Sequence, residues 1–399
     1  MHNLGCKVNA YELEAIQQLL ENRGYEIVPF APGADVYIIN TCTVTNIADR
    51  KSRQMLHKAK KMNPDAVVVA CGCYVQAAGE KFEEDTAIDL IIGNNKKKDL
   101  VDILENFLAE REDGGKPSDA ECKSFLVDMT HNREYETLSI SKTAEHTRAF
   151  LKVQDGCNQF CTYCIIPYAR GRVRSRRQSD VVEEVKRLVE AGYQEVVLTG
   201  INLSAYGQDI GKNLCDAVET ACSAPGIQRV RLGSLEPEQM DESTIARLAQ
   251  QPKLCPQFHL SLQSGCDSTL RRMNRHYDTA EYRAIVQRLR KNFSNAAITT
   301  DVMVGFPGET AAEFSQSLAF IREIGFAKAH VFAYSRRPGT RADKVPGQVT
   351  NAVKEERSRA MIAAAAETQR AFFAAQCGRT EPVLFEQLCE RLLDRLYKE

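Results

Sequence analysis

The chain has 399 residues, of which 43% are hydrophobic and 26% charged, and its formal net charge is −1 at pH 7. This composition is typical of a globular protein with two or three domains, and the near-zero charge argues against a generally basic nucleic-acid binder. No run of about 18 apolar residues occurs, and the first residues do not form a charged-then-apolar signal, so we expect a cytoplasmic protein without a membrane span. Fourteen cysteines in such a chain favour metal or redox chemistry over disulfides.

Apolar runs and helical patterns alternate over the first part of the chain. Strands are expected at 25–30, 36–40, 66–70 and 90–92, and helices at 12–23, 49–62 and 98–109. This alternation predicts an α/β domain with a doubly wound parallel sheet over residues 1–109. The next stretch is polar and contains Gly-Gly and Pro, so residues 110–148 are expected to form a linker and crossover.

Three cysteines of this first domain stand in turn-like contexts: Cys6 in Gly-Cys-Lys-Val-Asn, Cys42 in Asn-Thr-Cys-Thr, and Cys73 in Gly-Cys-Tyr-Val-Gln. Cys42 and Cys73 each follow an apolar strand, and ligands of open α/β sheets gather at the carboxyl ends of strands. The three thiols could therefore converge there, whereas scattered cysteines are more often small buried hydrophobes. Cys71 is interpreted as such a core residue.

A second series of strand–helix units begins at residue 149. Strands are expected at 149–153, 195–199, 229–232, 258–262, 297–304 and 329–334, and helices at 180–190, 242–250, 279–291 and 311–324. Six units predict a partial parallel (β/α)6 barrel, with its chemistry at the carboxyl ends of the strands. An alanine-rich stretch over 352–375 predicts a long helix that ends this domain, residues 149–375.

The loop after the first barrel strand carries Cys157, Cys161 and Cys164 with C-x3-C-x2-C spacing. Three thiolates on one short loop suit an iron–sulfur cluster or zinc. No fourth ligand lies nearby, so the pattern favours a [4Fe-4S] cluster with one open iron. A structural zinc knuckle is the alternative, although the paired C-x2-C form of zinc ribbons is missing. Tyr163, before the third cysteine, is expected to shield the cluster from water.

Polar motifs also follow the other barrel strands. Thr199 and Gly200 follow the second strand, Gln263 follows the fourth, and Asp301 lies in the fifth. Because these strand ends share one rim, their convergence predicts a binding site. Asp301 could instead be a buried carboxylate paired with an arginine. His259 is interpreted as a core histidine.

A run of arginines comes directly after the cysteine loop, at Arg170, Arg172, Arg174 and Arg176, followed by Arg177. Guanidinium groups bind phosphates bidentately, so this run is the candidate RNA-phosphate contact. Two other basic stretches, 50–61 and 96–98, could equally be solvated helix faces.

The three-cysteine loop resembles that of the radical S-adenosylmethionine (SAM) enzymes, and the contexts of Cys6, Cys42 and Cys73 extend the resemblance to the radical SAM methylthiotransferases, over about residues 1–375. The resemblance implies one [4Fe-4S] cluster on the barrel loop that cleaves SAM to a 5′-deoxyadenosyl radical. It implies a second [4Fe-4S] cluster in the first domain that holds or donates sulfur. It also implies SAM contacts, at Thr199 and Gly200 by the family pattern and at Gln263 and Asp301 by position.

The flanks Gly-Cys-Lys-Val-Asn and Cys-Thr-Tyr-Cys-Ile-Ile-Pro-Tyr-Ala-Arg-Gly are most similar to the branch of the family that acts on N6-threonylcarbamoyladenosine in tRNA. This implies 2-methylthiolation of that base, the tRNA anticodon loop as partner, an electron donor such as flavodoxin, a sulfur donor that the sequence does not identify, and a monomeric chain. Isopentenyladenosine in tRNA or a ribosomal protein is the alternative substrate, and a non-catalytic iron–sulfur carrier is an alternative of another class.

Family members continue into a small RNA-binding β-barrel, and residues 376–399 are too few to complete it. We expect them to form a truncated remnant, with a strand at 381–386 and a helix at 388–397. Relatives also place a strand before the first cysteine, where this chain has five residues.

Overall fold

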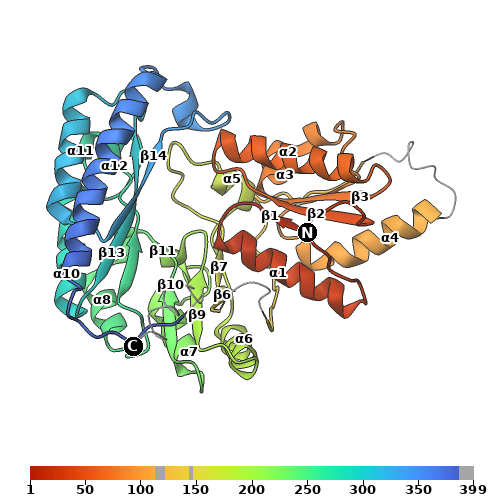
Figure 1. The fold of residues 1–399 in the computed structure, drawn as a ribbon, viewed down its shortest axis with the longest axis horizontal. Helices are drawn as coiled ribbons and strands as arrows, with labels where there is room; N and C mark the ends of the chain where they lie inside the picture. Colours follow the sequence, from red (N-terminus) through yellow and green to blue (C-terminus); the bar gives the residue numbers. More distant parts are fainter. Residues whose placement is uncertain (113–121, 143–146, 386–399) are drawn as a thin grey trace, which may run out of the picture.

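The computed structural model describes residues 1–112, 122–142 and 147–385. Its amino-terminal domain lies beside a larger barrel domain (Figure 1). No helix in these residues is both long and apolar enough to cross a membrane.

The amino-terminal domain is built on one parallel sheet. Its strands follow one another in space in the order β1 (His2–Asn3), β2 (Val36–Thr41), β3 (Val67–Gly72), β4 (Leu90–Ile92) and β5 (Lys123–Phe125). Helices α1 (Lys7–Asn22) and α4 (Leu100–Glu112) cover one face, and α2 (Asn46–Met62) and α3 (Cys73–Ala78) cover the other (Figure 1). The predicted doubly wound sheet is therefore confirmed.

The alternation of side chains along the strands explains the two covered faces. Ile38 and Val69 pack under α1 and α4, whereas Ile39 and Val68 pack under α2 and α3. A strand buried on both faces reads as a continuous apolar run, as in Val-Val-Val-Ala of β3. Cys71 is fully buried in this core, as its interpretation required.

Two sequence-based boundaries of this domain differ from the structure. Residues 25–30 form no strand, although they were expected to form one. β5 falls within the predicted linker, 110–148, but pairs with β4 and belongs to the sheet. The short run Lys-Ser-Phe is too brief to produce a periodic signal, which explains why it was missed. Residues 113–121 of the predicted linker lie outside the described residues.

The second domain is an open barrel of six parallel strands. They are β6 (Ala149–Lys152), β9 (Glu195–Thr199), the third strand in two pieces, β10 (Arg229–Leu232) and β11 (Ser234–Leu235), then β12 (Gln257–Leu260), β13 (Ala297–Val304) and β14 (Lys328–Ala333). In the part of the chain that is described, β6 and β14 do not pair, so the barrel is not closed. The predicted partial (β/α)6 barrel is confirmed.

Helices cover the outside of the barrel (Figure 1). They are α6 (Gln178–Glu190), α7 (Leu214–Ser223), α8 (Glu242–Ala249), α9 (Asp267–Arg272), α10 (Thr279–Asn292), α11 (Ala311–Ile324) and α12 (Asn351–Ala374). The amino terminus of α11 has a full capping box, in which Thr310 and Glu313 exchange side-chain and backbone hydrogen bonds. On β13, Ile298, Val302 and Val304 are buried in the core with these helices, and the alternate positions face the barrel interior.

Short elements connect the two domains. A hairpin of β7 (Gln154–Asp155) and β8 (Arg174–Ser175) and the helix α5 (Ile166–Arg170) lie between the barrel and the first domain. Tyr11 of α1 packs in the barrel core, and its hydroxyl lies 2.6 Å from the Leu138 carbonyl oxygen and 2.9 Å from the Glu184 carboxylate, within hydrogen-bond distance of both. The domains therefore share packed interior rather than meeting across a solvated surface.

Of the two elements expected near the carboxyl terminus, the structure describes only part of the first. Residues 381–385 form no strand, contrary to the expected strand at 381–386. The helix expected at 388–397 lies outside the described residues.

Candidate metal centres

The loop after β6 is held rigidly from several sides. Gly156 has φ +72°, and a Cβ there would lie 1.9 Å from the Arg172 carbonyl oxygen, so only glycine fits. The Cys157 amide donates to the Gly171 carbonyl at 3.0 Å, and the Thr162 amide donates to the Met273 carbonyl at 3.0 Å. A backbone fixed in this way presents the three thiols of the loop in a defined arrangement.

Polar groups surround the sulfur atoms of this loop. Asn202 donates to Cys157 Sγ at 3.7 Å, and the Arg275 guanidinium donates to Cys161 Sγ at 3.3 Å. Burial raises the pKa of Cys157 to about 11, and the neighbouring Cys161 thiol adds to the rise. Burial also raises the pKa of Cys164, again with Cys161 contributing. Clustered buried thiols need a cation to ionise, so this donor set fits a metal centre.

The second set of thiols gathers at the carboxyl end of the amino-terminal sheet. Cys6 precedes α1, Cys42 follows β2, and Cys73 begins α3. Burial raises the pKa of Cys42 to about 11, with the Cys73 and Cys6 thiols contributing to the rise.

Two glycines allow these loops to approach one another. A Cβ on Gly5 would lie 3.0 Å from Cys42 Sγ, and Gly5 has φ +111°. Gly72 has φ +96°, and a Cβ there would lie 2.5 Å from Asn40 Oδ1. The Cys42 amide is in turn fixed by Ser52 Oγ at 3.2 Å. The turns that carry Cys6, Cys42 and Cys73 therefore lie against one another, and a shared cluster on their three thiols remains a prediction.

Among the described residues, no three His, Cys, Asp or Glu side chains are already arranged as a site for a metal ion. The choice between zinc and an iron–sulfur cluster therefore rests on the cysteine spacing and on the comparisons with known proteins.

Polar atoms without partners mark the barrel rim beside Cys157. Thr199 Oγ1, Asn202 Oδ1 and both carboxylate oxygens of Glu238 are buried and have no hydrogen-bond partner in the described structure. Gly200 lies against Gln154, whose Oε1 accepts from the Asn202 amide at 2.8 Å. Buried polar atoms nearly always have partners, so this rim fits a polar ligand.

Gln263 and Asp301 lie on neighbouring strand ends of the same barrel. Gln263 has φ +64°, and its backbone N–H donates to the backbone carbonyl of Asp301 at 2.9 Å. The Asp301 carboxylate lies 3.4 Å from His259 Nε2, so its partner is a histidine and not the arginine of the alternative. His259 also contacts Thr299 Oγ1 at 3.1 Å, and its side chain is 17% exposed. Gln263 and Asp301 therefore remain proposed contacts of SAM.

The prediction that the arginine run binds RNA phosphates is wrong for three of its four members. Arg170, Arg174 and Arg176 are at most 1% exposed and paired inside the protein. Arg176 contacts Glu184 at 2.5 Å, and Arg174 donates to the Arg170 carbonyl at 2.8 Å. Local charge density cannot distinguish a buried ion network from a solvated basic patch. Arg172 is half-buried and stacks on the Phe160 ring at 4.5 Å from its centroid.

Sequence reasoning also missed residues of the site. Arg275 lies far along the chain from Cys161 and carries no motif, yet it contacts Cys161 and forms an ion pair with Glu236. Glu236 and Asn202 fall within the polar strand-end motifs but could not be singled out there. A separate cavity of about 390 Å³ beside β2 is lined by none of the six cysteines.

The family models define the class of protein to which this chain belongs. Residues 151–321 match the radical SAM superfamily, and residues 1–93 match uncharacterized protein family UPF0004. The radical SAM methyltransferase TsrM from Kitasatospora setae, solved with cobalamin and a [4Fe-4S] cluster, has TM-score 0.63 and 14% identity, over 86% of this chain and 73% of that chain. At that identity the likeness establishes the fold alone.

Curated relatives identify the family. The threonylcarbamoyladenosine tRNA methylthiotransferase MtaB of Bacillus subtilis is 40% identical over 91% of this chain and 79% of its own length. The MtaB of Aquifex aeolicus is 39% identical, over 94% and 90%. A tRNA-2-methylthio-N(6)-dimethylallyladenosine synthase of Pelotomaculum thermopropionicum is 34% identical, over 96% and 85%. This chain belongs to the radical SAM methylthiotransferase family, and SAM and two [4Fe-4S] clusters are its cofactors.

Proposed function

We propose that this chain methylthiolates C2 of N6-threonylcarbamoyladenosine in the anticodon loop of tRNA. The support is the ranking of its relatives. Those from Bacillus subtilis, Aquifex aeolicus and Thermotoga maritima, at 40%, 39% and 35% identity, are named for threonylcarbamoyladenosine. Those named for dimethylallyladenosine are 34% and 33% identical.

Each set of cysteines would hold one cluster. Cys157, Cys161 and Cys164 would hold the cluster that binds SAM, and Cys6, Cys42 and Cys73 would hold the second. When bound, the clusters and SAM supply the radical, the sulfur and the methyl group, chemistry that protein side chains lack. An aromatic C–H bond is not acidic enough for ordinary base catalysis, which accounts for the need for such cofactors.

The surrounding side chains would orient and shield these groups. Arg275 and Asn202 donate to the sulfur atoms of Cys161 and Cys157, which favours their thiolate forms. The acceptor atoms of Thr199 and Glu238 are suited to an ammonium group such as that of SAM. Tyr163 packs edge-on against Phe306, with ring centroids 6.4 Å apart, and would shield the cluster from water on that side.

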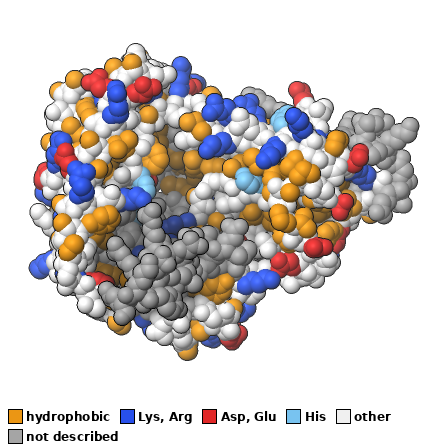
Figure 2. Space-filling view, viewed as in Figure 1, with side chains coloured by type: hydrophobic (Ala, Val, Ile, Leu, Met, Phe, Trp, Pro, Cys, Tyr) orange, Lys and Arg blue, Asp and Glu red, His pale blue; other side chains and the backbone are white. Residues whose placement is uncertain are grey.

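Exposed basic residues replace the buried arginines as candidate RNA contacts. Arg172 lines an open groove of about 520 Å³ beside the cysteine loop, together with Arg133. Figure 2 shows Lys and Arg side chains gathered over α2, where Arg50, Lys51 and Arg53 are exposed. Such residues can release counterions from the RNA backbone. Bases of anticodon loops are already partly unstacked, which lowers the cost of bringing one to the cluster.

Three further features are proposals by family resemblance. We propose a cytoplasmic, monomeric enzyme that takes electrons from a donor such as flavodoxin.

Mass spectrometry of tRNA nucleosides tests the proposed substrate. A strain that lacks its own threonylcarbamoyladenosine methylthiotransferase should regain the 2-methylthio form of that nucleoside when it expresses this chain. The Cys157→Ala variant is the matched control and should restore none. Methylthiolation of the isopentenyl nucleoside instead would overturn the substrate assignment.

Purified protein tests the alternative of a non-catalytic iron–sulfur carrier. With SAM and a strong reductant, the proposed enzyme should release 5′-deoxyadenosine. A carrier would release none although its clusters are fully assembled.

A further inference from the structure

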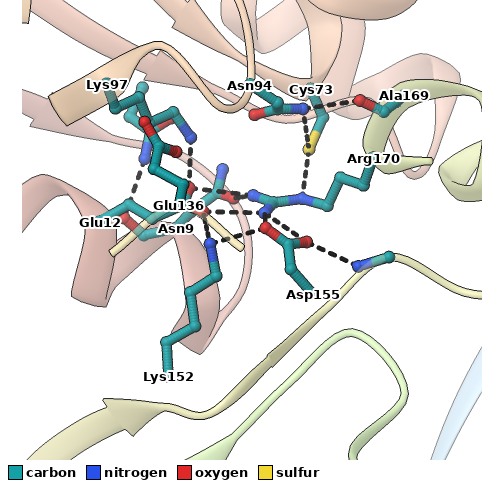
Figure 3. Close-up of polar contacts among 12 residues, drawn as sticks. Asn9, Glu12, Cys73, Asn94, Lys97, Glu136, Lys152, Asp155, Ala169 and Arg170 are labelled. Carbon is teal, nitrogen blue, oxygen red and sulfur yellow. Dashed lines mark hydrogen bonds and ion pairs between the residues drawn. The ribbon is translucent and has the colours of Figure 1, made fainter. Parts of the chain in front are cut away.

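A buried arginine lies between the two sets of cysteines. Arg170 is the last residue of α5, which follows directly after Cys164 of the barrel loop. Its side chain is fully buried and extends into the amino-terminal domain, where Nε donates to Cys73 Sγ at 3.0 Å (Figure 3). One side chain from the radical SAM domain therefore touches a candidate ligand of the other cluster.

Every N–H group of this guanidinium has a partner. Nη1 donates to Glu12 at 2.8 Å and to Asp155 at 3.1 Å, and Nη2 donates to Asn9 Oδ1 at 2.8 Å and to Glu12 at 3.0 Å (Figure 3). The planar fork of arginine is required for five donors in these directions, and a lysine ammonium could not reproduce them.

Asn9 extends the contact to the other two cysteine loops. Its Nδ2 donates to the Leu4 carbonyl at 2.7 Å, beside Cys6, and to the Thr41 carbonyl at 3.0 Å, beside Cys42. Its side-chain oxygen is the acceptor for Arg170. Through the Asn9 amide and its own contact with Cys73, Arg170 is thus connected to the loops of all three thiols.

The side-chain amide of Asn94 also connects α5 to Cys73. Asn94 Nδ2 donates to the Ala169 carbonyl at 2.8 Å and lies 3.7 Å from Cys73 Sγ (Figure 3). The residue before Arg170 is therefore bound to the same corner of the amino-terminal domain.

Buried carboxylates fix the guanidinium from behind. Glu12 and Asp155 also accept from Lys152, at 2.7 Å and 2.6 Å. Lys97 contacts Glu12 from the opposite side (Figure 3). A charge with this many buried partners cannot move without leaving an unpaired ion, so the position of Arg170 is fixed.

We infer that Arg170 is a positioning residue for the amino-terminal cluster. It holds Cys73 and, through Asn9, the loops of Cys6 and Cys42, and its charge-assisted hydrogen bond goes to the sulfur of Cys73, which would be a ligand of that cluster. Such bonds stabilise the reduced, more negative state and raise the reduction potential. The inference rests on the cluster at these cysteines and not on the identity of the RNA base.

The test uses full-length protein in which Cys157, Cys161 and Cys164 are alanine, so that a single cluster remains. In this background Arg170→Lys keeps the positive charge but removes the donor to Cys73. We expect a lower midpoint potential, measured by a redox titration followed by electron paramagnetic resonance. We also expect iron loss to a chelator to be about tenfold faster, since outer contacts of metal ligands contribute about that much.

Arg176→Lys is the matched control, because Arg176 is equally buried and contacts Glu184 and the Tyr11 hydroxyl rather than a cysteine. It should keep the parent potential and iron-release rate. Parent values in Arg170→Lys, or equal shifts in both variants, would overturn the inference.

Asn9→Ser keeps the test decisive if Arg170→Lys does not fold. This variant leaves Arg170 and Cys73 in contact but removes the connection to the Cys6 and Cys42 loops. Faster iron release with little change in potential is expected. Release at the parent rate would refute the positioning role. None of these measurements involves RNA, so a wrong substrate assignment would leave their outcome unchanged.

Discussion

Replacement of Glu12 by glutamine should destabilise the protein strongly. The Glu12 carboxylate is 1% exposed and contacts three buried cations, Arg170, Lys152 and Lys97. Glutamine keeps the shape of the side chain but removes its charge, which leaves those cations in excess. Removal of one partner from a buried ion network costs about 3–5 kcal/mol, and we expect a loss of that size.

Urea unfolding of the cluster-free chain, followed by circular dichroism, measures the change. Glu105→Gln is the matched control, because Glu105 pairs with Arg23 at 2.6 Å on the surface, with its side chain 37% exposed. Surface pairs contribute at most about 1 kcal/mol. A similar, small effect of both substitutions would refute the view that the network around Glu12 holds the domains together.

The pH dependence of the unfolding free energy is a second test of the ion pairs that Glu12 makes. Burial alone would raise the pKa of Glu12, but Arg170, Lys152 and Lys97 outweigh it and hold the pKa well below its usual range. A depressed carboxylate pKa contributes stability that is present above the unfolded-state pKa of about 4.3 and is lost as the pH falls towards the folded-state value. The parent should therefore lose stability below about pH 4.3, and Glu12→Gln should show a shallower loss.

Three other substitutions probe the loop and the rim. Arg172→Ala should weaken tRNA binding and reduce its salt slope by about 1; an unchanged slope would remove Arg172 from the interface. Gly156→Ala forces a Cβ to 1.9 Å from a carbonyl oxygen, so the reconstituted protein should lose about half of its iron; full iron content would contradict this. Asn202→Ala removes a donor to Cys157, so 5′-deoxyadenosine release from SAM should fall about tenfold; an unaltered rate would show that this contact is dispensable.

The sequence predicted those parts of the fold that depend on local periodicity. The amino-terminal sheet, the barrel strands and the longest helices follow from apolar runs and helical spacing. The limits of β9, β10, β13 and α11 agree with their predicted ranges. Short elements failed, because neither the three residues of β5 nor the six of α3 contain enough periods to be recognised.

The candidate ligands could be read from motifs, whereas the contacts around them could not. The cysteines stand in recognisable turns, but Arg275 and Glu12 reach the site through tertiary packing that leaves no local pattern. The arginine run shows the reverse error. Its charges looked like a surface for RNA, but three of them pair with carboxylates on other elements: Glu12 on α1, Asp155 on β7 and Glu184 on α6.

The most direct test of the central claim is the iron content of the anaerobically reconstituted chain. Two four-iron clusters on separate cysteine sets predict about eight irons per chain. Alanine at Cys6, Cys42 and Cys73, or at Cys157, Cys161 and Cys164, should each leave about four irons. Bound zinc, four irons in the intact chain, or a triple variant that keeps its full iron content would contradict the account.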